Sequence, residues 1–374
     1  MKTLTDYEQM GFRTAANLAD GHAYQGLTRG QETIVDRLGA TWRKAEAESI
    51  PQSEHRYVER YAGLIGSASL HRAAGHLILP TASNSIDLVA AYLKLAGRRV
   101  LLTHPTFDNL ALILWRRGVR PNPVAEREIA DGGLLARRLA DTDVLFLVNP
   151  NNPTGTSLSE DAFTAVVRAC VAHGVTLVID ASFRLFYPQT WDAYRVLQDL
   201  GASYIVFEDT GKVFPTQDMK ASLLTYSADH SAALQEIYNE IYLCVSRFTL
   251  MVLGDFFEEA RTGGLHESVH ALVATRRAQV RQALGEGLIE PAALASRISV
   301  EWLSTARTGL SDRAVVEELR ALGVGVLPGR GFFWDRPDAA DSSRNVRISL
   351  MKPRGEFERG LAIMADYFEG RVRR

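Results

Sequence analysis

The sequence predicts an α/β fold in which a doubly wound, mostly parallel sheet is accompanied by a smaller α+β domain and an N-terminal arm. Short runs rich in Leu, Val and Ile recur through the middle of the chain, and stretches with helical spacing separate them. Strands that are buried on both faces have such continuous apolar runs, and their alternation with helices indicates right-handed parallel crossovers. The C-terminal part changes to a mixed order of helices and strands, which is typical of a separate α+β unit.

The large domain is expected to span residues 46–264. Its helical stretches have one apolar face, as Ile86, Val89, Ala90 and Leu93 illustrate at positions that share one side of a helix. The predicted strands of this domain are Leu77–Leu79, Arg99–Thr103, Val144–Val148, Val175–Ile179 and Tyr204–Phe207.

The small domain is expected to span residues 265–374, and residues 1–45 are expected to form the N-terminal arm and part of the small domain. The arm has few core signals. A terminal segment is ordered only when it is tied down, so we expect the arm to pack on the active site or on a second subunit. The predicted elements of the small domain are a helix over 265–284, a strand at Val300–Leu303, a helix over 311–322, an apolar run at Gly323–Pro328, a strand at Asn345–Leu350 and a terminal helix.

Composition and charge exclude several classes of function. The 374 residues include 42 Lys and Arg against 44 Asp and Glu, a net charge of −2, which argues against nucleic acid as a partner. The two cysteines, Cys170 and Cys244, provide neither a disulfide framework nor a zinc motif. The N-terminus lacks an apolar signal segment, and Ile241–Phe257 is too polar for a membrane span and is expected to be a buried helix. We therefore expect a cytoplasmic enzyme with no membrane partner.

Polar residues follow several of the predicted strands, at the edge of a parallel sheet where ligands bind. Thr81, Ala82 and Ser83 open a helix after the first strand, and free backbone N–H groups at a helix N-terminus bind anions. A plain helix cap explains these residues equally well. Phe107 follows the next strand and places an aromatic ring at the same edge, where a core role is the alternative.

The next three strands end in residues with stronger chemical meaning. Asn152 lies in a rigid Asn- and Pro-rich turn, and its amide can donate to a ligand oxygen. Asp180 ends a buried strand and is expected to need a cationic partner. Lys212 follows a glycine after the last of these strands, where burial favours a neutral amine nucleophile over a solvated surface charge. An anion site, an aromatic ring, an amide, a carboxylate and a lysine together match the needs of pyridoxal 5'-phosphate (PLP).

The order of these residues resembles the fold-type-I aminotransferase family, most specifically in Asn152-Pro153-Thr154-Gly155 followed by Asp180 and Lys212. The resemblance implies that Lys212 forms the Schiff base with PLP, that Asp180 pairs with the pyridinium nitrogen, and that Arg347 binds the substrate carboxylate. The other residues that the resemblance assigns to the cofactor are Thr81, Ala82, Ser83, Phe107, Asn152, Thr210 and Lys220. Two positions depart from the family pattern: Phe183 replaces a tyrosine, and Lys220 replaces an arginine.

Several stretches resemble a narrower group, the PLP- and oxygen-dependent L-arginine oxidases of specialised metabolism. These stretches are Ala19–Ala23, His104–Asn109, Asp180–Arg184, Glu208–Lys212 and Asp218–Lys220. The resemblance implies oxidation of free L-arginine by dioxygen without metal or flavin. The implied product is 4-hydroxy-2-ketoarginine with its deaminated relative, or a 4,5-dehydroarginine.

Some roles implied by the resemblance to arginine oxidases rest on single residues. His22 on the arm is the predicted group for handling water or a proton, and a loop histidine without a role is the alternative. Asp209 is expected to meet the guanidinium or to support the lysine loop. Ala15 and Ala16 stand where acidic residues are expected in hydroxylating relatives, which leaves the product branch open. The family is commonly dimeric, and Tyr61 is a predicted contact to the cofactor phosphate of a neighbouring subunit.

Two other functions compete with the arginine oxidase. One is an ordinary PLP-dependent aminotransferase or cyclase that acts on arginine or a derivative. The other is a PLP-binding regulator without catalysis, against which the lack of a basic DNA-binding extension argues.

Overall fold

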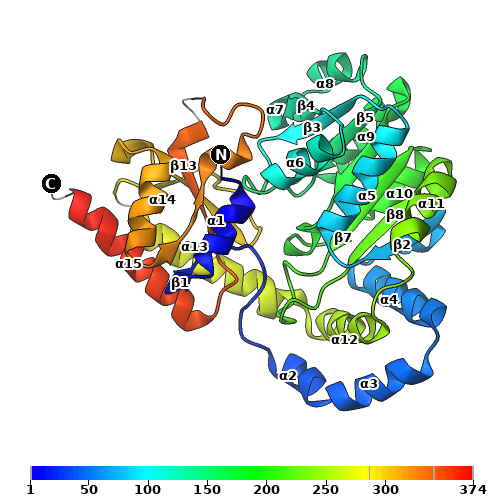
Figure 1. Ribbon diagram of the computed structural model, residues 1–374, viewed down its shortest axis with the longest axis horizontal. Helices are drawn as coiled ribbons and strands as arrows, with labels where there is room; N and C mark the ends of the chain where they lie inside the picture. The colour runs from blue at the N-terminus through cyan, green and yellow to red at the C-terminus, as the bar shows by residue number, and fades with distance from the viewer. Residues whose placement is uncertain (1, 286, 340–341, 373–374) are drawn as a thin grey trace.

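The computed structural model describes residues 2–285, 287–339 and 342–372, and it has two lobes (Figure 1). The larger lobe is built on a seven-stranded sheet in the order β2-β8-β7-β6-β5-β3-β4. All neighbouring pairs are parallel except those of β8, which is antiparallel to both β2 and β7. The predicted doubly wound, mostly parallel sheet is therefore confirmed.

The strands of this sheet agree with the predicted runs to within two residues, apart from two strands that the prediction missed. β4 (Asn122–Ala125) contains a proline and β8 (Ser222–Tyr226) contains serine and threonine, so neither shows a continuous aliphatic run. The other strands are β2 (Gly75–Leu79), β3 (Val100–His104), β5 (Val144–Val148), β6 (Thr176–Asp180) and β7 (Tyr204–Asp209).

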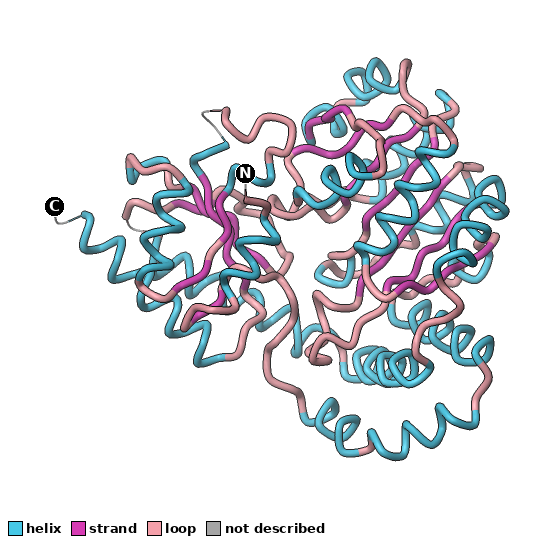
Figure 2. Tube along the Cα trace, viewed as in Figure 1, coloured by secondary structure: helices cyan, strands magenta, loops and turns pink. Residues whose placement is uncertain are grey.

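Helices cover both faces of the large sheet (Figure 2). Their buried residues repeat at helical spacing, and Ser and Thr side chains cap several N-termini, such as Ser159 at α9. The helices of the large lobe are α4 (Ile50–Leu64), α5 (Ala82–Leu95), α6 (Asp108–Arg116), α7 (Glu126–Ala130), α8 (Gly132–Leu139), α9 (Glu160–His173), α10 (Ala193–Asp199), α11 (Ser231–Ile241) and α12 (Arg247–Gly263).

The smaller lobe contains a four-stranded antiparallel sheet in the order β12-β13-β10-β9, covered by helices. Its helices and strands follow the predicted order, although the helix expected over 265–284 begins with a π-helical turn (His266–His270). The elements are α13 (Ala271–Leu284), β9 (Glu290–Pro291), β10 (Val300–Ser304), α14 (Asp312–Ala321), β11 (Val324–Gly325), β12 (Leu327–Pro328), β13 (Asn345–Ser349) and α15 (Arg354–Val372).

The N-terminal segment divides between the two lobes. α1 (Leu4–Gly11) and β1 (Ala16–Asn17) lie on the small lobe, where β1 pairs in parallel with β11. α2 (Arg29–Asp36) and α3 (Leu38–Ala47) instead contact α12 beside the large sheet. The two parts of this N-terminal segment thus pack on different lobes, and the domain boundary expected at residue 45 stays a prediction.

The helix expected over Ile241–Phe257 is only partly present. α11 ends at Ile241 and α12 begins at Arg247, with Ser246 capping it, so five residues between them are not helical. Leu243 in this connection is 90% exposed, whereas Leu250 to Leu253 on α12 are buried. The apolar composition was a poor guide here because it does not show where a cap interrupts the helix.

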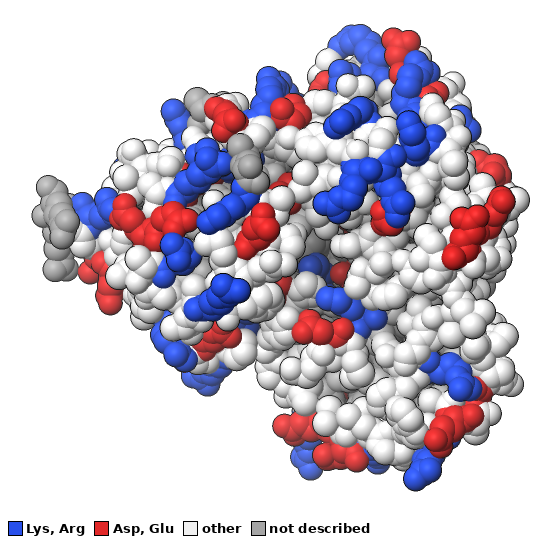
Figure 3. Space-filling view, viewed as in Figure 1, with Lys and Arg blue, Asp and Glu red and all other residues white. Residues whose placement is uncertain are grey.

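No helix within the described ranges is long and apolar enough to cross a membrane. Lys and Arg side chains are interspersed with Asp and Glu over the face shown in Figure 3. That mixed surface agrees with the near-neutral net charge of the sequence.

A buried ionic network lies around Glu208 on β7. Its carboxylate accepts hydrogen bonds from the Arg184 side chain (2.9 Å) and from the hydroxyl groups of Tyr194 (3.1 Å) and Tyr61 (2.9 Å). Tyr61 is buried inside its own chain by this contact. The prediction that Tyr61 reaches a neighbouring subunit is therefore wrong, because its hydroxyl already has an internal partner.

We expect Glu208→Ala to lower the free energy of unfolding by about 3–5 kcal/mol, because it leaves the Arg184 guanidinium buried without a counter-charge. The measurement is urea denaturation at a fixed cofactor concentration. Asp87→Ala is the control, since Asp87 pairs with Arg117 at a partly exposed site and its loss should cost about 1 kcal/mol or less. Equal effects of the two substitutions would contradict this account.

Candidate active site

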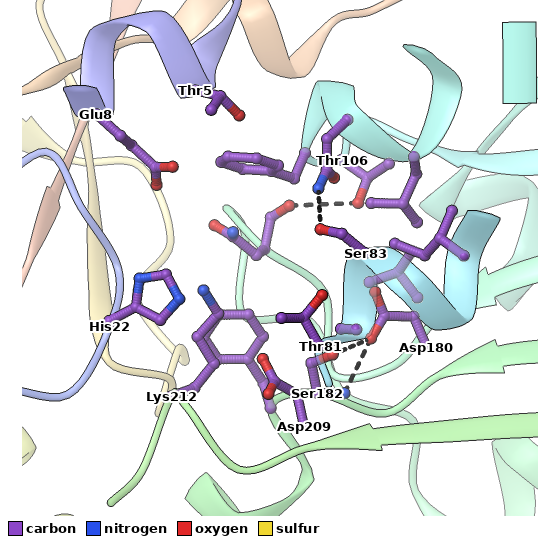
Figure 4. Close-up of a pocket in the computed structure, with 18 of the residues that line it drawn as sticks. Thr5, Glu8, His22, Thr81, Ser83, Thr106, Asp180, Ser182, Asp209 and Lys212 are labelled. Atoms are coloured by element: carbon purple, nitrogen blue, oxygen red, sulfur yellow. Dashed lines mark hydrogen bonds between the residues drawn. The ribbon is translucent and has the colours of Figure 1, made fainter. Parts of the chain in front are cut away.

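A cavity of about 240 Å³ lies between the two lobes at the carboxyl ends of the large-sheet strands. The structure brings nearly all of the predicted site residues to this cavity (Figure 4). Those that line it are His22, Thr81, Ala82, Ser83, Phe107, Asn152, Asp180, Asp209, Lys212, Lys220 and Arg347. The exception is Thr210, which is not among the lining residues.

Thr210 makes contacts within the protein, and its predicted cofactor contact stays a prediction. Its hydroxyl accepts from the Ala221 backbone N–H (3.0 Å) and lies 3.2 Å from the Ala221 carbonyl oxygen. These bonds hold the lysine loop against the start of β8. The motif placed Thr210 next to the site, but sequence proximity does not determine the direction of a side chain.

The N-terminus of α5 forms one wall of the cavity. Thr81 is the helix cap, and its hydroxyl accepts from the Asn84 backbone N–H (3.2 Å). The N–H groups of Ala82 and Ser83 belong to the first turn, where backbone donors lack partners within the helix and carry the positive end of its dipole. This wall, with the Lys220 ammonium also lining the cavity, provides the charge and the donors that a phosphate group needs.

Asp180 lies buried at the end of β6, deep in the cavity. One of its oxygens accepts from the Ser182 hydroxyl (2.5 Å) and backbone N–H (3.0 Å). Burial raises the pKa of Asp180 to about 6, although the Ser182 hydrogen bonds lower it, so the carboxylate is mostly ionised at neutral pH. Within the described ranges it forms no ion pair, so the cation that the sequence predicted as its partner has to come from a ligand.

Lys212 and Asp209 enter the cavity from the loop that follows β7. The Gly211 N–H donates to the Asp209 carboxylate (3.1 Å), so Asp209 supports the lysine loop while it also faces the cavity. A Cβ atom at Gly211 would lie 3.0 Å from the Lys220 side chain and 3.3 Å from the His22 ring. The glycine therefore permits the close approach of three functional side chains.

His22 is held in a chain of polar contacts that the sequence did not predict. Its Nδ1 lies 2.5 Å from the Asp20 carboxylate, and its Nε2 lies 3.0 Å from the Lys220 ammonium. The other Asp20 oxygen accepts from the buried Lys352 ammonium (3.0 Å). Burial raises the pKa of Asp20, but the His22 hydrogen bond and the Lys352 charge outweigh it and hold that pKa below its usual range. An ionised Asp20 keeps the proton on Nδ1 and leaves Nε2 as an acceptor toward the cavity.

α1 contributes two cavity residues that sequence reasoning missed, Thr5 and Glu8 (Figure 4). The Glu8 carboxylate lies 3.6 Å from the guanidinium of Arg347, which is 1% exposed and also donates to the Ala19 carbonyl. Thr3-x-x-Asp6 forms a capping box at the start of α1, a pattern that could have predicted this helix. The role of Glu8 could not be predicted because Arg347, the residue that it contacts, lies far away in the sequence.

The arm does carry an acidic residue into the site, but not at the expected positions. Ala16 is buried in β1 and Ala15 is exposed beside it, and neither lines the cavity. Glu8 occupies the cavity instead. The product branch that Ala15 and Ala16 left open therefore stays open.

The cavity fits PLP in the chemistry of its residues. The buried side-chain oxygen of Asn152 lacks a hydrogen-bond partner in the described part of the chain, as an amide awaiting a ligand does. Asp180, Lys212 and the α5 N-terminus supply the remaining groups that a pyridine nitrogen, an aldehyde and a phosphate require. Among the residues that the structure describes, no cluster of His, Cys, Asp or Glu is arranged to hold a metal ion.

Comparison with known proteins defines the class of enzyme. The family model of aminotransferase class I and II matches residues 41–354. The chain therefore belongs to this family and is a PLP-dependent enzyme. Two curated relatives are each 30% identical over 149 residues: a histidinol-phosphate aminotransferase from Rubrobacter xylanophilus and a threonine-phosphate decarboxylase from a Sinorhizobium species. These matches span 42% of each relative's length and about two-fifths of this chain.

Solved structures extend the likeness over the whole chain. A structure of MppP soaked with the product 2-ketoarginine has a TM-score of 0.88 and 36% identity, and the match covers 94% of this chain and 99% of that chain. An aminotransferase from Mycobacterium tuberculosis has a TM-score of 0.78 and 18% identity over 98% of this chain and 96% of that chain, which shows the shared fold. The predicted resemblance to fold-type-I aminotransferases is thus confirmed.

We expect Lys212→Ala to abolish covalent attachment of PLP, because the side chain that forms the Schiff base is absent. Borohydride reduction followed by peptide mass spectrometry should label the wild-type peptide that contains Lys212. Lys220→Gln is the matched control and should retain the label with weaker cofactor affinity. Labelling of Lys220 in the wild-type protein would overturn the assignment.

Proposed function

We propose that the chain is a PLP-dependent oxidase of free L-arginine that consumes dioxygen and deaminates the amino acid, with hydroxylation at C4 or desaturation of the side chain as further outcomes. The observation that carries this proposal is the 36% identity over 99% of MppP, whose structure was solved with the product 2-ketoarginine. The charges of the cavity support the same substrate.

Recognition of arginine requires a hydrogen-bond donor for its carboxylate and an acceptor for its guanidinium. Arg347 is buried, and its Nε has no hydrogen-bond partner in the described part of the chain, so it can receive a carboxylate through its planar fork. Glu8 and Asp209 provide carboxylates in the same cavity for the guanidinium. When a substrate carboxylate takes Arg347, Glu8 loses its only nearby cation among the described residues and becomes available to the substrate side chain.

The residues divide the chemistry among them. PLP, when bound, supplies an electron sink that stabilises negative charge at the substrate α-carbon. Lys212 accepts the proton from Cα, and Asp180 holds a proton on the ring nitrogen through its ionised carboxylate. Phe183 lines the cavity where a tyrosine would donate to the cofactor, and a phenyl ring cannot make that hydrogen bond. The simplest reaction converts arginine, dioxygen and water into 2-ketoarginine, ammonia and hydrogen peroxide.

His22 is the proposed base for later steps at the substrate side chain. With its proton on Nδ1, the Nε2 atom can take a proton from carbon or from an attacking water. The Lys220 ammonium lies 3.0 Å from Nε2 and can donate a hydrogen bond to it, which would keep Nε2 from taking a proton. A phosphate group in the cavity would draw the ammonium away. A homodimer, which is common in this family, stays a prediction for this chain, as does its expected location in the cytoplasm.

A second candidate function is an aminotransferase or decarboxylase of a phosphorylated substrate. The curated relatives named histidinol-phosphate aminotransferase and threonine-phosphate decarboxylase favour it. Their matches cover less than half of each protein, whereas the match to MppP covers nearly all of that chain.

We expect the purified protein with PLP to consume oxygen when L-arginine is added in air, without any keto-acid acceptor. An oxygen electrode and mass spectrometry of the products measure this reaction and separate ketoarginine, its hydroxylated form and dehydroarginine. Lys212→Ala should neither consume oxygen nor form any of these products, and that result would exclude a non-catalytic regulator. The proposal is lost if no oxygen disappears and a keto acid is obligatory for turnover.

We expect Asp20→Asn to lower the rate of oxidation by about tenfold to a hundredfold, because a neutral amide no longer fixes the His22 proton on Nδ1. The measurement is the pH profile of kcat, which should lie below that of the wild type across the whole range because the bond that orients the His22 ring is weakened. Asp131→Asn, at the exposed cap of α8, is the control and should leave the profile unchanged. A normal profile for Asp20→Asn would remove His22 from the proton-transfer steps.

A further inference from the structure

The segment that brings Glu8 and Thr5 to the cavity has little support of its own. α1 has eight residues, and helices this short are marginal in water without tertiary contacts. Beneath it lies a second cavity of about 170 Å³, bordered by Leu4, Tyr7, Trp115 and Trp334. Leu4 and Tyr7 are buried against the rest of the protein, so the position of α1 depends on these tertiary contacts and on specific hydrogen bonds.

One such contact comes from Asp108, the first residue of α6. Its carboxylate accepts a hydrogen bond from the Leu4 backbone N–H at 2.9 Å, across 104 positions of sequence. The Leu4 N–H begins α1, where free donors and the helix dipole favour an acidic partner. The other Asp108 oxygen is buried and has no hydrogen-bond partner among the described residues, so the group is not engaged elsewhere.

The same short stretch of chain touches the active site. Phe107, the residue before Asp108, lines the catalytic cavity and packs edge-to-face against Phe332 at 5.9 Å between ring centres. On the opposite side, Leu4 packs so closely on Gly331 that a Cβ atom there would lie 2.6 Å from the leucine side chain. α1 is thus seated between α6 of the large lobe and the 329–332 turn of the small lobe.

We propose that Asp108 is a positioning residue that anchors the N-terminus of α1 over the active site and thereby places Glu8 and Thr5 against the substrate. The inference rests on the proposed function only where it concerns arginine. Asp108 does not touch the catalytic cavity, and it acts through α1.

The anchor is expected to respond to pH. Burial raises the pKa of Asp108 to about 7, with the negative charges of Glu8 and Asp6 adding to the effect and the Leu4 hydrogen bond opposing it. An undocked Asp108 would be solvated and have an ordinary carboxyl pKa, so docking of α1 takes up a proton. Docking is therefore strongest at low pH and weakens as pH rises through about 7. The ionisable groups around Asp108 are Lys2, Asp6, Tyr7 and Glu8 on the N-terminal segment, Arg313 on α14 and Arg330 on the 329–332 turn.

The test is hydrogen exchange of the α1 amides in the PLP-bound enzyme without substrate. Asp108→Ala should lower the protection factors of the Glu8–Gly11 amides by about tenfold, as loss of one buried hydrogen bond implies. Asp131→Ala is the matched control, because it removes a carboxylate that accepts from Gly133 and Leu134 at the start of α8, away from the site. Unchanged protection in Asp108→Ala would overturn the proposal.

Asp108→Asn provides an independent test, because its amide oxygen can still accept from the Leu4 N–H but the group cannot ionise. Its α1 protection factors should match the wild type at pH 6 and stay constant up to pH 8, whereas those of the wild type fall. Where Asp108→Ala does not fold, a pH-dependent loss of protection in Asp108→Asn overturns the proposal by itself.

Kinetics separate this inference from the proposed function. Asp108→Ala should raise the KM for L-arginine by about tenfold with a smaller change in kcat, and Asp108→Asn should restore it. If the enzyme does not oxidise arginine but the α1 protection factors fall in Asp108→Ala, only the proposed substrate is refuted. Normal KM and normal protection in Asp108→Ala would refute the anchor alone.

Discussion

The ion pair between Asp20 and Lys352 ties the two ends of the chain together inside the protein. Both side chains are 1% exposed, and their charges lie 3.0 Å apart. Taking two charges out of water costs several kcal/mol each, and only close contact with further hydrogen bonds offsets that cost. Asp20 meets this condition because its carboxylate also accepts from the ring and the backbone N–H of His22. Lys352 has the ring of Tyr24 4.7 Å away.

The geometry of the active site depends on that pair. Gly21 follows Asp20 directly and lies beside Arg347, where a Cβ atom would be in ordinary contact with the guanidinium at 3.5 Å. Ala19 precedes Asp20, and its carbonyl oxygen accepts a hydrogen bond from the same guanidinium. The residues on either side of Asp20 therefore both contact the Arg347 guanidinium, and His22 reaches the cavity two residues later. An arm without the buried pair would lose all three contacts together.

The sequence predicted the site residues that directly follow a predicted strand. Asp180 and Lys212 follow buried strands with continuous apolar runs, so their place at the sheet edge follows from the strands themselves. β8 was missed because serine and threonine interrupt its apolar pattern, although burial and pairing on both sides stabilise it. Glu8 and Asp20 were missed as site residues because their roles depend on contacts with β13 and the turn after it, more than 300 residues away in sequence. Local pattern carries no information about such distant pairing.

The charges that line the cavity are balanced before any ligand enters. Glu8, Asp180 and Asp209 share the cavity with Lys212, Lys220 and Arg347, so acidic and basic side chains are present there in equal number. A phosphate has the α5 N-terminus and Lys220 available, a substrate carboxylate has Arg347, and a substrate guanidinium has Glu8 or Asp209. Each ligand charge thus meets an opposite charge nearby, which limits the desolvation cost of binding. Under the proposed function, a substrate without a positive side chain would leave Glu8 inside the cavity with Arg347 already occupied, and that unpaired charge would disfavour a neutral amino acid.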